Sequence, residues 1–360
     1  MNKDKERSKI GQFLVRKNIV FSGKRYGIDA LGAMAQGLFA SLLIGTIVST
    51  LGQQLGIEFL LTVGNYTKSA YVVGAAMAIS IGYALQAPQL VLFSLVSVGA
   101  AANELGAAGG PLAVLVITVL AAECGKAVSK ETRVDILVTP LVTIIVGVFF
   151  SLWWAPAIGT AAGHVGDLIM WATELQPFFM GILVSVIVGV ALTLPISSAA
   201  ICAALGLTGL AGGAAVAGCC AQMVGFAIMS FPENKWGGLI SQGIGTSMLQ
   251  MGNIVKNPRI WIPPTLASAI TGPIATCIFH FQMNGPAISS GMGTCGLVGQ
   301  IGVYTGWIND MTEGTKTAIT AMDWIGMFLI CFLLPAVLSV LFCRLLKKAG
   351  WIKEGDLTLS

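Results

Sequence analysis

The sequence predicts an all-α polytopic membrane protein with about ten transmembrane helices, some of them broken or folded back as re-entrant hairpins. Three observations predict this class. Hydrophobic residues make up 55% of the 360 positions and charged residues only 10%, which leaves too little polar surface to cover a soluble globule of this size. Apolar runs of about 20 residues, the length that a helix needs to cross a bilayer, recur along the chain. A transmembrane β-barrel would instead show short segments of alternating hydrophobicity.

The ends of the chain differ in composition from its middle. Residues 1–28 contain many Lys and Arg residues but no apolar run, so they predict a basic cytoplasmic leader and not a cleavable signal peptide. Residues 29–346 contain the apolar runs and form the predicted transmembrane domain. Residues 347–360 are polar again and are predicted to be a cytoplasmic tail.

The predicted spans follow one another with short connections. In order, they cover residues 29–51, 69–86, 89–103, 111–125, 137–158, 178–204, 207–230, 237–254, 260–282 and 318–346. The spans 89–103 and 111–125 are short for full crossings, and 286–306 is rich in glycine, so we expect re-entrant hairpins here. Small residues four positions apart, as at Gly74 and Ala78, allow helix backbones to approach closely.

Charge placement predicts the orientation in the membrane. Basic residues follow the fourth, eighth and tenth spans, whereas the connection 159–176 carries acidic residues and no Lys or Arg. Because cytoplasmic connections are enriched in Lys and Arg, both termini are predicted to be cytoplasmic and 159–176 to be an outside loop. The net charge of +4 is explained by this bias, so nucleic acid is not an expected partner.

The strongest candidate for solute binding is the charged, glycine-rich stretch that begins with Glu233 and Asn234. A carboxylate beside Pro232, between apolar spans, can accept hydrogen bonds from solute hydroxyls, and the neighbouring amide can donate and accept. The alternative is that Glu233 and Lys235 lie in a solvated loop.

A second candidate lies further along the chain, where Gly293, Thr294 and Gln300 belong to a glycine-rich tract. Irregular backbone of this kind can present free N–H and C=O groups to a polar ligand. A tight helix crossing is the alternative, since it also requires small residues. Gln242 adds an amide in an apolar span, where burial without a partner costs about 1–3 kcal/mol.

Two weaker patterns accompany these candidates. Asn103 and Glu104 form a second polar cluster before a Gly-Gly-Pro sequence. The sequence PISSA at 195–199 is echoed by PAISSG at 286–291. Paired interrupted segments often mark a transporter's binding site, although so short a pattern can also arise by chance.

No catalytic machinery is expected on this chain. The two histidines stand in no catalytic arrangement, and the eight cysteines show no paired C-x-x-C spacing of a metal site. No phosphate-binding glycine loop is present either. We therefore predict no catalytic residue, no metal and no cofactor.

Three ordered motifs resemble one known family. These are ENKWGGLISQG at 233–243, KNPRIWIPP at 256–264 and GMGTCGLVGQ at 291–300. They resemble the enzyme IIC membrane proteins of the sugar phosphotransferase system, more narrowly the branch of the perfringolysin regulator, and the resemblance spans most of 25–345. The Gly-Ile-Thr-Glu sugar motif of glucose-type IIC proteins is absent, so no sugar ligand is transferred from that group.

The resemblance implies an enzyme IIC-like transport domain over 29–346, working as a homodimer in the bacterial inner membrane. The standard system passes phosphate from phosphoenolpyruvate through IIA and IIB proteins to a sugar held by IIC. The non-membrane segments here are too short to fold as such carriers, so IIA and IIB are expected on separate chains.

The leading hypothesis is thus a permease for a small polar solute, expected to be a sugar, which binds between broken helices. A phosphorylation-independent facilitator or ion-coupled carrier is the alternative, with Glu233 or Glu104 taking a proton or cation. A membrane sensor that regulates gene expression through the basic leader is a third hypothesis.

Overall fold

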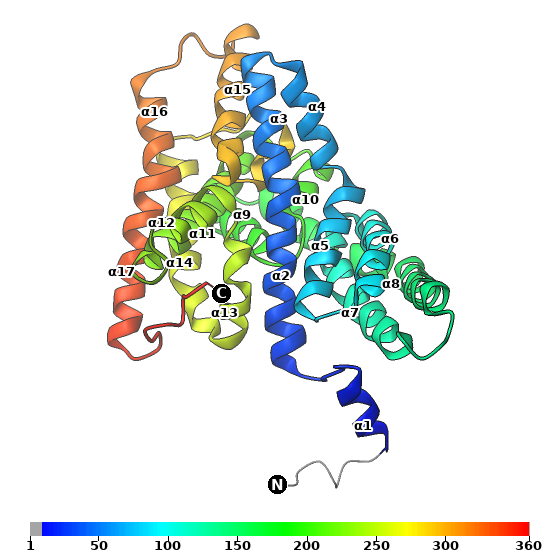
Figure 1. Cartoon of the computed structure of the whole chain (residues 1–360). Helices are drawn as coiled ribbons and strands as arrows, with labels where there is room; N and C mark the ends of the chain where they lie inside the picture. The colour runs from blue at the N-terminus through cyan, green and yellow to red at the C-terminus, as the bar shows by residue number, and fades with distance from the viewer. Residues whose placement is uncertain (1–8, 360) are drawn as a thin grey trace.

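The computed structural model describes residues 9–359, and these residues fold as helices joined by turns, with one isolated bridge between Gly209 and Met283 (Figure 1). The predicted all-helical class is therefore confirmed. Apolar composition explains this choice, because only helices and closed barrels satisfy their backbone hydrogen bonds within a bilayer.

The first half of the structure, residues 9–173, starts with the short helix α1 (Lys9–Arg16). It continues into one long apolar rod from Arg25 to Leu55, which contains α2 (Ala30–Leu38) and α3 (Ile44–Leu55). Gly56 adopts a φ of 66° and ends α3. The chain then folds back as α4 (Glu58–Thr67) along α3, at the top of Figure 1.

Four further helices complete the first half and pack against one another. They are α5 (Ala70–Ala84), α6 (Gln89–Gly106), α7 (Gly110–Val128) and α8 (Asp135–Thr173). Helix α5 packs on α2 and α6, and α6 packs on α7 and α8. A Cβ atom at Gly74 would lie 2.2 Å from the Gly99 carbonyl oxygen, so the small residues of α5 do set its close approach to α6.

The second half of the structure, residues 177–359, surrounds one buried helix. Its helices are α9 (Pro177–Thr193), α10 (Ser198–Ala204), α11 (Gly209–Met229), α12 (Phe231–Ile240), α13 (Met251–Lys256), α14 (Ile262–Pro273), α15 (Val298–Thr312), α16 (Ala321–Phe328) and α17 (Leu334–Lys348). The most apolar stretch of α11 is 94% buried, and α9, α14 and α17 pack around this helix. Helices α16 and α17 join into one rod at the left of Figure 1.

The described residues contain five apolar helical segments long enough to cross a membrane: Arg25–Leu55, Gln89–Val128, Asp135–Thr173, Gly209–Met229 and Ala321–Lys348. Helices Ala70–Ala84 and Pro177–Thr193 are shorter but also apolar. The Gln89–Val128 segment contains the antiparallel pair α6 and α7, which pack against each other.

Several predicted boundaries differ from the structure. The expected outside loop 159–176 is mostly helical, because α8 continues through Pro140 and Pro156 to Thr173. The expected span 237–254 is broken into short helical pieces, since Thr246 is extended at φ −156° and ψ 141°. Helices α4 and α15 lie outside the predicted spans, because neither carries a long apolar run.

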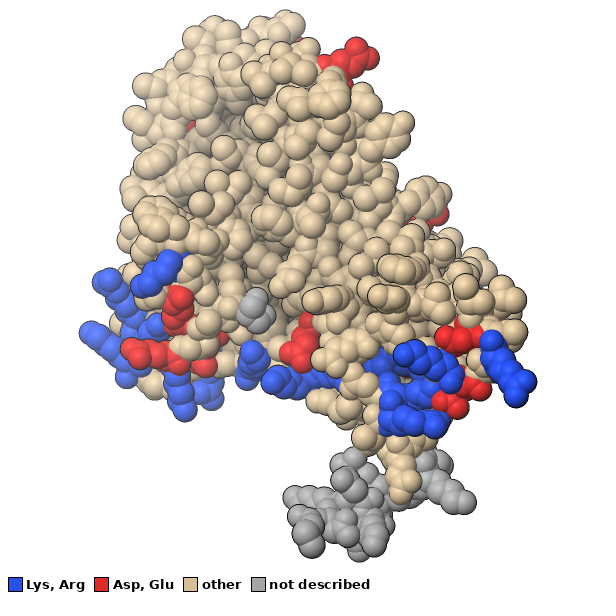
Figure 2. Space-filling model, in the orientation of Figure 1, with Lys and Arg blue, Asp and Glu red and all other residues tan. Residues whose placement is uncertain are grey.

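Basic residues gather at one end of the molecule. Figure 2 shows Lys and Arg side chains in a band at the end nearest α1, while the upper part of this face is largely uncharged. Lys126, at the end of α7, donates to the carbonyl oxygens of Asn18 and Leu85. Arg16 pairs with Glu131 in the connection before α8. These contacts join three chain segments at the basic end.

Candidate functional site

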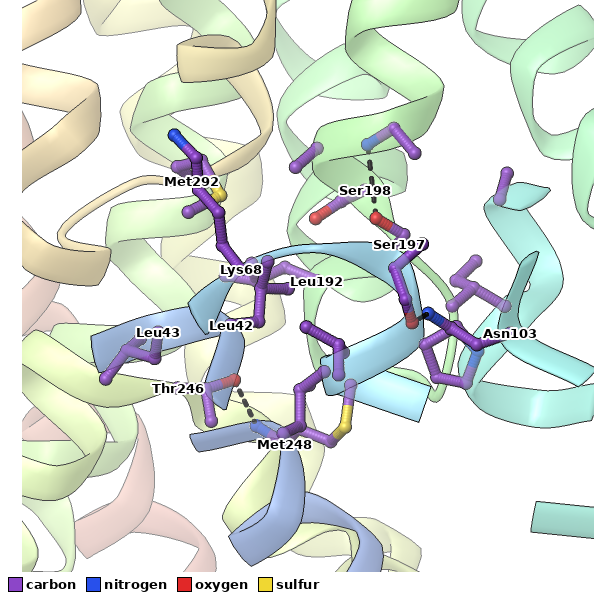
Figure 3. Close-up of a pocket in the computed structure, with 18 of the residues that line it drawn as sticks. Leu42, Leu43, Lys68, Asn103, Leu192, Ser197, Ser198, Thr246, Met248 and Met292 are labelled. Atoms are coloured by element: carbon purple, nitrogen blue, oxygen red, sulfur yellow. Dashed lines mark hydrogen bonds between the residues drawn. The ribbon is translucent and has the colours of Figure 1, made fainter. Parts of the chain in front are cut away.

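One cavity of about 470 Å3 lies between the two halves and is lined by residues of both. We call it the inter-half cavity. Figure 3 shows Lys68 and Asn103 of the first half and Ser197, Thr246 and Met292 of the second half around the same space. Ligand pockets in proteins typically measure about 300–1,000 Å3 and combine apolar walls with a few polar groups. The inter-half cavity fits both criteria.

The first-half wall of the cavity carries its charged groups. Lys68, which follows α4, donates to the Ser49 hydroxyl at 3.0 Å. Asn103 donates from its amide to the Ala70 carbonyl at 2.8 Å, tying the end of α6 to the start of α5. Glu104 accepts the Tyr71 hydroxyl at 2.5 Å. A cation, an amide and a carboxylate therefore line one side of the cavity.

The second-half wall is built at a break between α9 and α10. Ser197 donates its N–H to the Ala108 carbonyl of the first half at 2.8 Å, and its hydroxyl accepts the Ala200 N–H at 3.2 Å. This break lets α10 begin beside the cavity, where Ala199 and Ala200 also line it. At this break the wall is made of small and hydroxylated residues, while Leu192, Ile196 and Met292 form apolar parts of the same wall.

The two echoed serine segments pack together at this wall, and Ser198 of the first segment also lines the cavity. The Ser198 hydroxyl donates to the Gly291 carbonyl at 2.8 Å, and a Cβ atom at Gly291 would lie 2.5 Å from the Ser198 carbonyl oxygen. The Ser290 hydroxyl donates to the Leu207 carbonyl at 2.6 Å. The repeated sequence therefore corresponds to two interrupted segments that pack directly on each other.

The remaining polar group of the cavity is Thr246, which lies in the extended break before α13. Its hydroxyl accepts the Met248 N–H at 3.2 Å, and both residues line the cavity. Among residues 9–359 no group of three or more His, Cys, Asp or Glu side chains is placed to hold a metal ion. The arrangement can bind a solute through hydroxyl, amide and charged groups.

Two of the predicted site residues, Glu233 and Asn234, lie in contact with the end of the chain. Glu233 accepts the Leu357 N–H at 3.0 Å, and Asn234 donates to the Leu357 carbonyl at 2.8 Å. Lys347 lies 3.5 Å from the Glu233 carboxylate. Neither residue lines the inter-half cavity.

Gln242, the third predicted residue, is fully buried. Its amide donates to the Ser230 hydroxyl and to the Gly238 carbonyl, each at 2.9 Å. Its helical turn, Ser241–Gly245, packs against the turn Cys295–Leu297 of the second predicted segment. The structure thus brings the two predicted segments together at this point.

Gly293, Thr294 and Gln300 lie in the core beside α11. Gly293 adopts a φ of +52°, and a Cβ atom there would lie 2.6 Å from the Cys219 side chain. The Thr294 hydroxyl is 3.6 Å from the Met223 sulfur, and the Gln300 amide is 3.2 Å from the Cys220 sulfur. These residues do not line the cavity, although Met292 and Cys295 on either side of Gly293 and Thr294 do.

Sequence reasoning singled out Asn103, Glu104 and the serine at 197 only as weaker candidates, and it missed Lys68 and Thr246. Lys68 could have been found as a lysine between two apolar helices, where a charge indicates a functional site. Thr246 gave no such signal, because a threonine in an apolar segment is common.

The family is decided by a match over nearly the whole chain. A family model described as "Phosphotransferase system, EIIC" matches residues 28–359. The chain belongs to this EIIC family. The predicted resemblance is therefore confirmed, and the chain is a sugar-type membrane transporter component of the phosphotransferase system. No curated protein and no solved structure matches this EIIC chain.

Proposed function

We propose that the inter-half cavity binds the transported solute, and that this solute is a sugar. The observation that carries the proposal is a cavity of about 470 Å3, with polar groups from both halves, in a chain of the EIIC family. A sugar has hydroxyl groups around a ring with apolar C–H faces. Asn103, Ser197 and Thr246 can exchange hydrogen bonds with the hydroxyls, while the apolar walls contact the ring.

Transport then requires the two halves to move relative to each other. The cavity has a wall from each half, so a change in their relative position opens it to either side. The hydrogen bond from Ser197 to Ala108, at 2.8 Å, joins the halves and would be exchanged during such a movement. An elevator-like displacement of the second half against a fixed first half fits this arrangement.

The basic end of the molecule is proposed to face the cytoplasm of a bacterial cell, with both termini on that side of the inner membrane. IIA and IIB phosphocarrier proteins on separate chains would approach there and phosphorylate the bound sugar. We also propose a homodimer. Only 22% of the most apolar stretch of α8 is buried, so this helix can contact either lipid or a second copy of the chain. Crosslinking in native membranes distinguishes these two possibilities.

The six residues predicted from the sequence remain proposed contributors to solute handling. Gln242, Gly293 and Thr294 are next to cavity-lining segments, so they would act by shaping the wall. Gln300 keeps a buried carbonyl oxygen without a hydrogen-bond partner, which a solute or water could meet in another conformation. Glu233 and Asn234 would act at the basic end.

A cavity-filling substitution tests the site. A thermal-shift screen of sugars and sugar acids first identifies a ligand, because a ligand that binds the native form raises its apparent stability. Ala200 lines the cavity, whereas Ala203 of the same helix is exposed and does not. Ala200→Phe should weaken binding of that ligand by at least tenfold, and Ala203→Phe should leave it unchanged. Equal binding by both variants would remove the cavity as the solute site.

Glu104 favours a second candidate, an ion-coupled carrier that works without phosphorylation. Its carboxylate lines the cavity, where it could take up a proton or a cation with the solute. Uptake into liposomes without any phosphate donor, driven by a pH or sodium gradient and lost in Glu104→Gln, would support it. Uptake that depends on phosphoenolpyruvate and the soluble carriers would exclude it.

A further inference from the structure

The end of the chain forms a turn at residues 354–357 and packs against polar side chains of the second half. We call residues 351–359 the tail, and we call its five polar contact residues the amide clamp: Glu233, Asn234, Gln250, Asn253 and Asn257. Figure 1 shows the C-terminus beside α13, which carries Asn253. The clamp therefore lies at the basic end of the second half.

Most clamp contacts go to the main chain of the tail. Asn234 donates to the Leu357 carbonyl and accepts the Leu359 N–H, both at 2.8 Å. Gln250 also donates to the Leu357 carbonyl at 2.9 Å, and Asn253 donates to the Thr358 carbonyl at 2.9 Å. Side-chain amides thus hold the main chain of the tail at its turn, inside which the Thr358 N–H donates to the Gly355 carbonyl.

The carboxylate of Glu233 completes this pattern. One oxygen accepts the Leu357 N–H at 3.0 Å and the Thr358 hydroxyl at 3.1 Å. At the other end, Asn257 donates to the Trp351 carbonyl at 3.0 Å and to the Asp356 carboxylate at 2.8 Å. The main chain of the tail is held at both ends and along its last residues.

Apolar side chains of the tail supply the remaining contacts. Leu357 is fully buried and Ile352 is 2% exposed. The Arg259 guanidinium lies over the Trp351 ring, 5.2 Å from its centroid. Hydrogen bonds to the main chain accept many sequences, whereas buried pockets for two side chains select for apolar residues at these positions.

The clamp is held in place by a network of its own. Gln250 donates to the side-chain Oε1 of Gln242 at 2.9 Å, and Asn253 donates to the side-chain Oε1 of Gln250 at 2.8 Å. With the tail in place, Gln250 is fully buried and Asn253 is 7% exposed, and the tail carbonyls supply the hydrogen bonds that these buried amides require. Fixed, buried amides that need a main chain to bond are the features of a peptide-binding site.

We propose that the amide clamp is a peptide-binding site whose reversible ligand is the chain's own tail. Its ligand is a peptide that forms a turn, as the tail does at 354–357, with apolar side chains at the positions of Ile352 and Leu357. This inference does not depend on which solute occupies the inter-half cavity.

Peptide binding in trans tests the proposal directly. A protein truncated after Gly350 is titrated with a fluorescent peptide of residues 351–359, and binding is followed by anisotropy in detergent. We expect saturable binding, weakened at least tenfold by Leu357→Asp in the peptide. We also expect about a tenfold loss for Asn234→Ala in the protein, since two hydrogen bonds disappear.

The control variant is Asn309→Ala, an exposed asparagine of α15 outside the clamp, which should bind the peptide as the truncated parent does. Full-length protein, in which the tail occupies the clamp, should bind the peptide at least tenfold more weakly than the truncated form. The proposal is overturned if the truncated protein shows no saturable binding, or if the Leu357→Asp peptide binds equally well.

Hydrogen exchange on the unmodified full-length protein covers the case in which the truncated protein fails to fold. The amides of Leu357 and Leu359 donate to Glu233 and Asn234, so they should exchange at least tenfold more slowly than in the free peptide. They should also exchange completely over hours, while the tail leaves and returns. Exchange as fast as in the free peptide would overturn the proposal, and so would permanent protection equal to that of α11.

Discussion

The crossing of α9 and α11 gives a quantitative test of the packing described above. Gly218 of α11 lies against the backbone of Ser185 in α9, and a Cβ atom at Gly218 would be 1.8 Å from the Ser185 carbonyl oxygen. Such contacts below 3.0 Å do not occur in real structures, so Gly218→Ala must move the two backbones apart by more than 1 Å. The obstacle is main chain, which cannot rotate away as a side chain can.

Movement at this crossing is opposed by a third helix. The Ser185 hydroxyl donates to the Ser268 carbonyl of α14 at 2.8 Å, and a Cβ atom at Gly272 of α14 would lie 2.0 Å from the Gly181 carbonyl oxygen. Overpacking in a close-packed interior costs about 1–3 kcal/mol, and the gain in helix propensity from glycine to alanine offsets up to about 1 kcal/mol. Because α9 is held on both sides, we expect a net loss of about 2 kcal/mol.

Thermal unfolding in detergent measures this loss. Most cysteines are buried, so a dye that fluoresces on reacting with newly exposed thiols reports unfolding at a fixed scan rate. A loss of about 2 kcal/mol should lower the apparent Tm by on the order of 5 °C. Gly163→Ala in α8 is the control, because nothing lies within 4 Å of its Cβ position. If Gly218→Ala were as stable as Gly163→Ala, the described crossing would be wrong.

Two further predictions concern the basic end. A hydrogen bond from Lys17 is the main reason that the pKa of Glu131 lies below its usual range. This contact therefore stabilises the docked α1 at neutral pH and is lost as the pH falls below about 4. Hydrogen exchange of residues 9–16, corrected for its intrinsic pH dependence, should become faster below that pH, and Glu131→Gln should abolish this pH dependence. Lys126 is 1% exposed and lies 2.9 Å from the Glu123 carboxylate. Lys126→Ala leaves the Glu123 charge buried without its partner and should lower the free energy of unfolding by about 3–5 kcal/mol. A Tm equal to that of the exposed control Lys348→Ala would contradict this prediction.

Hydropathy located much of the fold. The predicted spans 69–86 and 207–230 agree closely with α5 (Ala70–Ala84) and α11 (Gly209–Met229), because an apolar run of this length needs a helix in a membrane. The same signal did not give the end of α8, since residues after 158 are less apolar and include three glycines, yet remain helical to Thr173. Hydropathy measures how strongly a segment partitions into lipid, and a helix can continue past the end of its apolar run.

The candidate site was less accessible from the sequence. The inter-half cavity depends on how helices from both halves pack, and this packing leaves only a weak polar cluster at Asn103 and Glu104 and no local pattern around Thr246. The contact of Asn234 with Leu357 joins residues 123 positions apart through main-chain atoms, which carry no sequence signal on the tail. The echoed serine segments were visible in the sequence, and the structure shows that they contact each other through Ser198 and Gly291.

The central claim, that solute binds between the two halves, is tested most directly by a cryo-EM structure of the protein with the sugar found in the thermal-shift screen. The account predicts sugar density in the inter-half cavity, within hydrogen-bond distance of Asn103, Ser197 or Thr246. Sugar density elsewhere, for example against Glu233 with the cavity empty, would contradict it.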